Sequence, residues 1–275
     1  GYSPRYKLLF WHEMAHNYFM GALGFNQTDR AFLDEGFTTY WEIRIMEELL
    51  GPENINVDRW ESFIVKDRDR WYRGLRPYIL WQKSDFALPL HVESDRPRVY
   101  LKYRVSAYYK SASMLFALQY LVGKEGIRSI MHAFYDRWKF HHPYEGDFFR
   151  CAEDTLGTSL QWFYDAWVRG TKKLDYSIDK IGSKSPDKAS LRIRREGDMI
   201  MPVKVAVEDA SGNTVTYFIP LDIEPTPPDC DIRLPRWDQL RDPHPEYVFD
   251  LAKTTVKEAK LDPEGLLADM NPLNN

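Results

Sequence analysis

The chain has 275 residues, of which 44% are hydrophobic and 28% charged, and this balance predicts a globular protein of one or two domains with a sizeable core. The formal net charge of −4 argues against a general attraction to nucleic acid or to an anionic membrane surface. No apolar run approaches the length of a membrane span. The two cysteines, Cys151 and Cys230, fit no metal-binding spacing, and we expect reduced thiols.

Two apolar segments near the start of the chain have the pattern of helices. Residues 6–19 are strongly apolar, which predicts a buried helix, and Gly21 and Gly24 then supply stop signals. A second helical run begins near residue 28 and ends at Gly51-Pro52. These segments carry the most informative residues of the chain.

The first helix contains an H-E-x-x-H pattern at residues 12–16. His12 and His16 are four residues apart, so their rings project from nearly the same face of the helix, about one turn apart, and can meet at one metal ion. Glu13 is offset by roughly 100° around the helix. We therefore expect Glu13 to flank the metal, where a carboxylate can take a proton from water.

Glu35 is the expected third metal ligand. It lies in the apolar run 32–37, and a carboxylate buried there without a partner would be costly. Three protein ligands and one open position are typical of a catalytic zinc. The pattern at 12–16 also occurs by chance, and helical histidines are often surface groups, but the three ligands together favour zinc. The pair His141-His142 is a weaker metal candidate, because adjacent histidines point in different directions; a surface or capping role is favoured.

The rest of the chain divides into helical and strand-like parts. Helical spacing continues over 58–75, 106–122, 125–139, 147–155 and 159–169, and three prolines predict an irregular loop over 76–99. From about residue 177 the pattern alternates, which predicts strands over 191–194, 202–207 and 215–219, a hairpin turn at 211–213 and a proline-marked loop over 225–228. We expect two domains, 1–176 and 177–275.

The motifs resemble those of a known family. The H-E-x-x-H pattern followed by E-G-F, with eighteen residues between His16 and Glu35, resembles the gluzincin aminopeptidases of the aminopeptidase N (membrane alanyl aminopeptidase) family. Residues 108–113 resemble that family's Y-x-K-G stretch. Tyr108 occupies the place of its catalytic tyrosine, and Ser111 replaces its usual glycine. Further resemblance is found at residues 140–149, 160–168, 261–265 and 274–275.

The resemblance implies a multi-domain protein, α then β: a helical zinc-peptidase (thermolysin-like) subdomain over 1–176, followed by a small β-sandwich over 177–275. It implies one zinc ion and an aminopeptidase that removes N-terminal residues from peptides. In that interpretation Glu13 handles the proton of the attacking water, and Tyr108 hydrogen-bonds to the oxyanion.

One family element is missing from the sequence. Family members carry a Gly-x-Met-Glu-Asn strand whose glutamate holds the substrate's amino group, and the pattern does not occur here. We therefore expect a fragment that lacks this strand and the N-terminal domain, so the absence of a signal peptide says nothing about localisation. We also expect poor activity of the fragment alone and possible self-association through an exposed apolar face. A non-catalytic scaffold that retains a zinc site, and a metallo-endopeptidase, remain alternatives.

Overall fold

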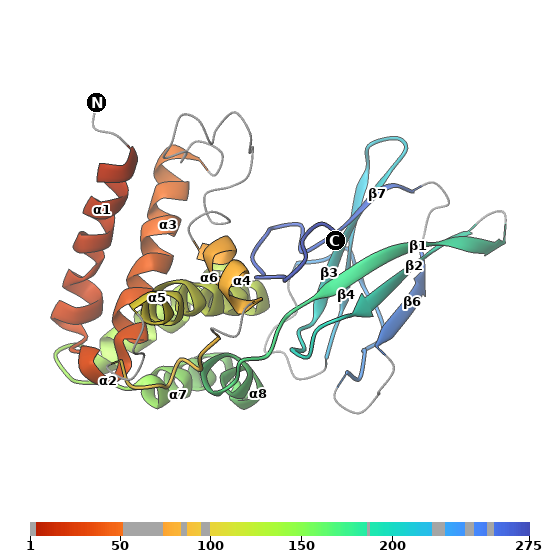
Figure 1. Ribbon diagram of the computed structural model, residues 1–275. Helices are drawn as coiled ribbons and strands as arrows, with labels where there is room; N and C mark the ends of the chain where they lie inside the picture. Colours follow the sequence, from red (N-terminus) through yellow and green to blue (C-terminus); the bar gives the residue numbers. More distant parts are fainter. Residues whose placement is uncertain are drawn as a thin grey trace. The chain divides into compact units, whose positions relative to one another are not determined.

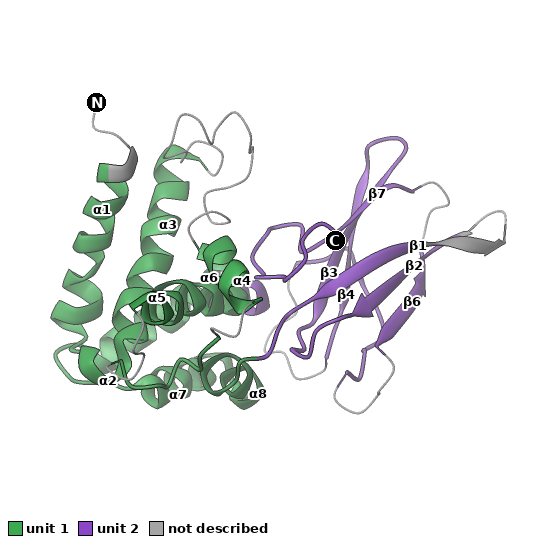
Figure 2. Ribbon diagram, in the orientation of Figure 1, with its two compact units in different colours: residues 1–119, 124–171 green, residues 120–123, 172–275 purple. Residues whose placement is uncertain are grey.

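A computed structural model of the protein describes residues 4–51, 74–83, 87–94, 100–185, 188–221, 229–239, 245–251 and 256–275. The chain forms two compact units, one of residues 1–119 and 124–171 and the other of residues 120–123 and 172–275 (Figure 2). The first unit is helical, and the second is built from β-strands (Figure 1). The expected fold class, a helical part followed by β-sheets, is confirmed. No helix in the described ranges is long and apolar enough to cross a membrane.

The first unit opens with two long helices joined by short segments. In chain order these elements are α1 (Pro4–Ala15), the π-helical segment η1 (Asn17–Ala22), α2 (Gln27–Ala31), the π-helical segment η2 (Phe32–Gly36) and α3 (Phe37–Leu50). The side chain of Asn26 accepts hydrogen bonds from the first backbone N–H groups of α2, which starts that helix. Helix α3 ends at Gly51, whose φ of 80° is accessible to glycine, as the sequence predicted.

Helix α1 is buried on one side only. It lies beside α3 (Figure 1), where Leu8 packs with Met46. Leu8 is 1% exposed, whereas Tyr6 and Phe10 are 67% and 55% exposed. Helix α1 is therefore buried on the side that α3 covers, and its other side leaves an apolar face open. The expected helix also changes form near His16, where α1 gives way to η1.

Later helices complete the unit. They are α4 (Arg76–Gln82), α5 (Tyr100–Arg104), the π-helical segment η5 (Val105–Lys110), α6 (Ser111–Trp138), α7 (Glu145–Leu156), α8 (Gln161–Tyr164) and the π-helical segment η6 (Asp165–Arg169). The expected break between the helices over 106–122 and 125–139 occurs at Gly123, which has a φ of 73° inside α6.

Two expectations need correction or fall outside the described ranges. The loop expected over 76–99 is wrong at its start, where α4 forms; Pro77 lies in the first turn of that helix, where a proline displaces no helical hydrogen bond. Residues 87–94 contain no helix or strand. Nearly all of the helix expected over 58–75, and the prolines at 225–228, lie outside the described residues.

An aromatic cluster forms the core of the first unit. The ring of Phe148 on α7 meets those of Phe37 and Phe134 edge to face, with centroids 4.9 and 5.2 Å apart. Tyr40 on α3 packs on Phe116 of α6 at 4.7 Å. These contacts fix α3 against α6 and α7. They therefore also hold η2, which leads into α3, and η5, which leads into α6.

The second unit contains two sheets. The strands are β1 (Tyr176–Ser185), β2 (Lys188–Arg195), β3 (Val203–Asp209), β4 (Thr214–Ile219), β5 (Ile232–Arg233), β6 (Glu246–Asp250) and β7 (Val256–Leu261). One sheet has the order β1-β2-β6, and the other has the order β5-β4-β3-β7. The rings of Tyr217 and Phe249 meet between the two sheets at 5.3 Å. The three strands and the hairpin turn predicted from alternation correspond to β2, β3 and β4, with Gly212 at a φ of 83°.

Candidate metal centre

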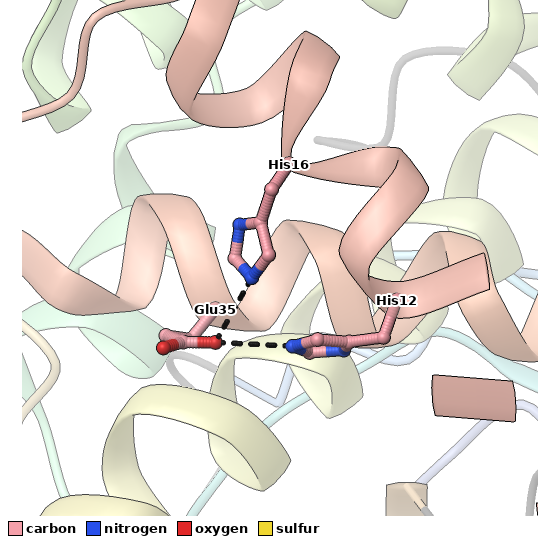
Figure 3. Close-up of side chains that lie close together, drawn as sticks. All are labelled: His12, His16 and Glu35. Atoms are coloured by element: carbon pink, nitrogen blue, oxygen red, sulfur yellow. Dashed lines mark hydrogen bonds and ion pairs between the residues drawn. The ribbon is translucent and has the colours of Figure 1, made fainter. Parts of the chain in front are cut away.

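The predicted ligands come together at the end of α1. His12 lies in the last turn of α1, and the backbone N–H of His16 donates to the His12 carbonyl at 3.3 Å, so the helical spacing holds through residue 16. The two imidazole centroids are 4.8 Å apart. Both rings point toward Glu35, which η2 contributes (Figure 3).

The distances between these side chains suit one metal ion. Nε2 of His12 lies 3.2 Å from Oε2 of Glu35, and Nε2 of His16 lies 3.6 Å from the same oxygen. One ligand atom from each of the three residues lies within 4.8 Å of the other two. Two ligand atoms bound tetrahedrally to zinc at about 2.1 Å are roughly 3.4 Å apart. The three side chains therefore fit a zinc ion with little movement.

The remaining ring nitrogens are held by carboxylates. Nδ1 of His12 lies 2.6 Å from Oε2 of Glu42, and Nδ1 of His16 lies 2.6 Å from Oδ1 of Asp34. Nε2 of Gln27 donates to the other Asp34 oxygen at 2.7 Å. Since an ionised carboxylate only accepts, each Nδ1 donates, and Nε2 is the nitrogen turned to the metal position.

The sequence analysis did not identify these acceptors. Glu42 follows Glu35 by seven residues, about two helical turns, which is the signal that could have placed both carboxylates near one helix face. Asp34 is adjacent to Glu35 in sequence, and its side chain is only 1% exposed. A carboxylate so buried needs a polar partner, and His16 supplies it.

The titratable side chains of the site stabilise one another's charges. Burial acts to lower the pKa of His12, but hydrogen bonds to Glu35 and Glu42 outweigh it and raise the pKa to about 9. Hydrogen bonds to Asp34 and Glu35 raise the pKa of His16 to about 10. Burial opposes ionisation of Glu35, yet both histidines bring its pKa down to about 2.

Of the two predicted catalytic residues, Tyr108 lies beside the candidate ligands, whereas Glu13 is exposed on α1. Tyr108, on η5, stacks on the His12 ring with centroids 6.1 Å apart and planes 8° apart. Burial, and after it the nearby Glu35 carboxylate, raise the pKa of the Tyr108 hydroxyl far above its ordinary value. The structure therefore brings Tyr108 to the ligand cluster. Glu13 is exposed on α1, next to His12 in the chain.

The histidine pair at 141–142 takes part in backbone contacts. Nδ1 of His142 lies 2.7 Å from the carbonyl oxygen of Gly24, and Nδ1 of His141 lies 2.9 Å from that of Lys139. Within the described part of the chain, His12, His16 and Glu35 are the group with the geometry of a metal site.

Comparisons with known proteins found a similar fold and a family. The fold is similar to that of aminopeptidase A from Legionella pneumophila, solved in complex with aspartic acid, with a TM-score of 0.63 and 15% sequence identity. That alignment covers 95% of this chain and 26% of the Legionella chain, so the present sequence spans about a quarter of that protein. No curated protein matches the sequence.

The family assignment comes from the sequence itself. The peptidase family M1 domain matches residues 4–167. The matched region contains the three candidate ligands, Glu13 and Tyr108. Because it also spans more than half of the 275 residues, the chain belongs to peptidase family M1.

Proposed function

We propose that this chain carries the zinc-binding part of an aminopeptidase that releases N-terminal residues from peptides. One observation carries the proposal: the ligand atoms of His12, His16 and Glu35 converge within 4.8 Å. Carboxylates hold the outer nitrogens of both histidines, an arrangement that orients imidazoles toward a metal. Membership of a metallopeptidase family supports the same interpretation.

The three ligands would hold zinc through two imidazole nitrogens and one carboxylate oxygen, leaving one coordination position for water or substrate. A bound zinc ion would supply Lewis acidity toward a peptide carbonyl and would lower the pKa of a coordinated water. Nitrogen and carboxylate ligands of this kind suit zinc well, whereas calcium and magnesium prefer oxygen ligands alone.

Glu13 and Tyr108 have separate roles in this proposal. The exposed carboxylate of Glu13 accepts the proton of the attacking water and passes it to the leaving amine. Tyr108 keeps its phenolic proton at neutral pH, because burial and the neighbouring Glu35 raise its pKa. Its hydroxyl can therefore donate to the oxygen on which negative charge develops, which lowers the barrier without tightening substrate binding.

The choice of aminopeptidase over endopeptidase rests on the family and on the structural neighbour. The chain has no Gly-x-Met-Glu-Asn pattern that would hold a substrate's amino group. A metallo-endopeptidase and a zinc-bearing scaffold are therefore the competing functions that an experiment has to separate.

The test uses the full-length protein. Wild type, Glu13→Gln and Tyr108→Phe are assayed on an aminoacyl amide and on its N-acetylated counterpart, and the zinc content of each sample is measured. We expect Glu13→Gln to retain zinc and lose nearly all turnover, and Tyr108→Phe to lower kcat by about 10²–10³. Equal cleavage of the acetylated substrate would indicate an endopeptidase. A zinc-loaded wild type that cleaves neither would indicate a scaffold.

A further inference from the structure

The segment that carries Glu35 and the segment that carries Tyr108 approach each other at one point. A Cβ atom added to Gly36 would overlap Oγ and Cβ of Ser111 and would lie 2.8 Å from the carbonyl oxygen of Ala107. Ser111 is fully buried, and the overlap involves its Cβ and a backbone carbonyl as well as its hydroxyl, so turning a side chain does not relieve it. Only glycine therefore fits at residue 36, directly after Glu35.

A side-chain hydrogen bond crosses this contact. Oγ of Ser111 donates to the carbonyl oxygen of Phe32 at 2.8 Å. Phe32 is the first residue of η2, which contains Glu35, and Ser111 follows the last residue of η5, which contains Tyr108. The bond thus joins the two short segments on which a metal ligand and the candidate oxyanion donor are placed.

The two segments that this hydrogen bond joins, η2 and η5, are both π-helical. A π-helical turn holds one residue more than an α-helical turn, is rare, and is found mostly at functional sites. Its register depends on tertiary contacts more than on local preference. The hydroxyl of Ser111 supplies a donor at a position where the resembled family pattern has glycine, which has no side-chain donor.

We propose that Ser111 is a positioning residue that fixes the Tyr108 hydroxyl against Glu35. The proposal deepens the proposed function and rests on it where catalysis is concerned. The opposing interpretation is that Ser111 only fills space between the helices. The two differ in what happens to Tyr108 when the hydroxyl is removed.

Ser113 provides a matched control on the same helix. It is also fully buried, and its Oγ donates to the carbonyl oxygen of Tyr109 at 2.7 Å, four residues earlier in the chain. That bond stays within one stretch of helix and does not reach η2. Ser113→Ala therefore removes a buried hydroxyl of the same kind without cutting the cross-link.

The first measurement needs no catalytic activity. Fluorotyrosine is placed at position 108, and ¹⁹F spectra of the wild type, Ser111→Ala and Ser113→Ala are compared, with melting curves to confirm folding. We expect the Tyr108 resonance to shift and broaden in Ser111→Ala and to stay unchanged in Ser113→Ala. An unchanged resonance in a folded Ser111→Ala would overturn the proposal. If that variant does not fold, Ser111→Gly removes the hydroxyl without adding bulk. Failure of both to fold beside a folded Ser113→Ala would assign the hydroxyl to folding and would also overturn the proposal.

The second measurement is a double-mutant cycle in the complete protein. We expect Ser111→Ala to lower kcat about tenfold with KM nearly unchanged, because misplacement of a group that acts in the transition state affects turnover more than binding. The same substitution in a Tyr108→Phe background should have almost no further effect. An equal loss in both backgrounds would overturn the proposal. If the wild type has no peptidase activity, the proposed function fails, while the fluorine spectra still decide whether Ser111 positions Tyr108.

Discussion

His16 and Asp34 are joined by a contact of 2.6 Å between Nδ1 and Oδ1. Asp34 is almost fully buried and is held on its other side by Gln27. This pair fixes the ring so that Nε2 faces Glu35, a relationship that the spacing of the histidines alone does not provide.

Replacement of Asp34 should therefore weaken metal binding. We expect Asp34→Ala to lower zinc affinity by about 10- to 100-fold, the usual effect of losing such a partner. Asp34→Asn should have a smaller effect, because its amide oxygen still accepts from Nδ1. Competition with a chromophoric chelator measures the affinities. The control is Asp29→Ala in α2, whose side chain contacts Asn26 and Tyr144 instead of a histidine. Equal affinity of Asp34→Ala and the wild type would show that the contact does not tune the site.

Lys110 makes stability depend on pH. Its Nζ is fully buried and donates to the carbonyl oxygens of Leu88 and Gly170 at 2.8 and 2.7 Å, and burial lowers its pKa to about 7. In the unfolded chain the lysine keeps its ordinary pKa of 10.5. Between these values the unfolded state binds more protons than the folded state, so raising the pH stabilises the fold. Below pH 7 both states are protonated, and the contribution is constant.

The measurement compares the wild type with Lys110→Met by urea unfolding from pH 6 to pH 9. Lys110→Met should be less stable, since it leaves two buried carbonyls without their donor. Above pH 7 the free energy of unfolding of the wild type should rise, relative to that of Lys110→Met, by up to about 1.4 kcal/mol per pH unit. The exposed Lys124, also on α6, gives the control Lys124→Met, for which no such slope is expected. Parallel pH curves for the wild type and Lys110→Met would refute the argument.

The exposed face of α1 should affect the solution state of the 275-residue chain. Tyr6, Leu9, Phe10 and Leu49 line an open apolar hollow of about 740 Å³ between α1 and α3. Exposed apolar patches of this kind promote association. We expect sedimentation equilibrium to give a mass above that of the monomer, and Leu9→Lys with Phe10→Lys to restore the monomer. Leu273→Lys is the control, since Leu273 is 95% exposed and lies in the other unit. A monomeric wild-type chain would contradict this prediction.

The convergence of the three candidate ligands was predictable because it depends largely on local geometry. Four-residue spacing on a helix brings His12 and His16 to one face, and the apolar surroundings of Glu35 indicate a buried partner. The partners of the outer nitrogens were not predictable in the same way. Which carboxylate meets which ring depends on the π-helical form of η2 and on how α1 lies against α3.

Other parts of the fold were harder to predict from the sequence. Residues 6–19 are apolar on most sides, and a sequence pattern does not show which of those sides the fold covers. Helix α4 was assigned to a loop because Pro77 was treated as a helix breaker, although it lies in the first turn. Strand β6 was not predicted; it pairs with β2, more than fifty residues earlier in the chain.

The central claim is that His12, His16 and Glu35 bind one zinc ion. The most direct test is the zinc content, by elemental analysis, of protein purified without chelator, compared with His12→Ala, His16→Ala, Glu35→Ala and the control His142→Ala. We predict one zinc per chain in the wild type and in His142→Ala, and loss of zinc in each of the other three. A wild type that cannot be loaded with zinc, or a zinc content that falls with His142→Ala and survives the loss of His12, would contradict the account.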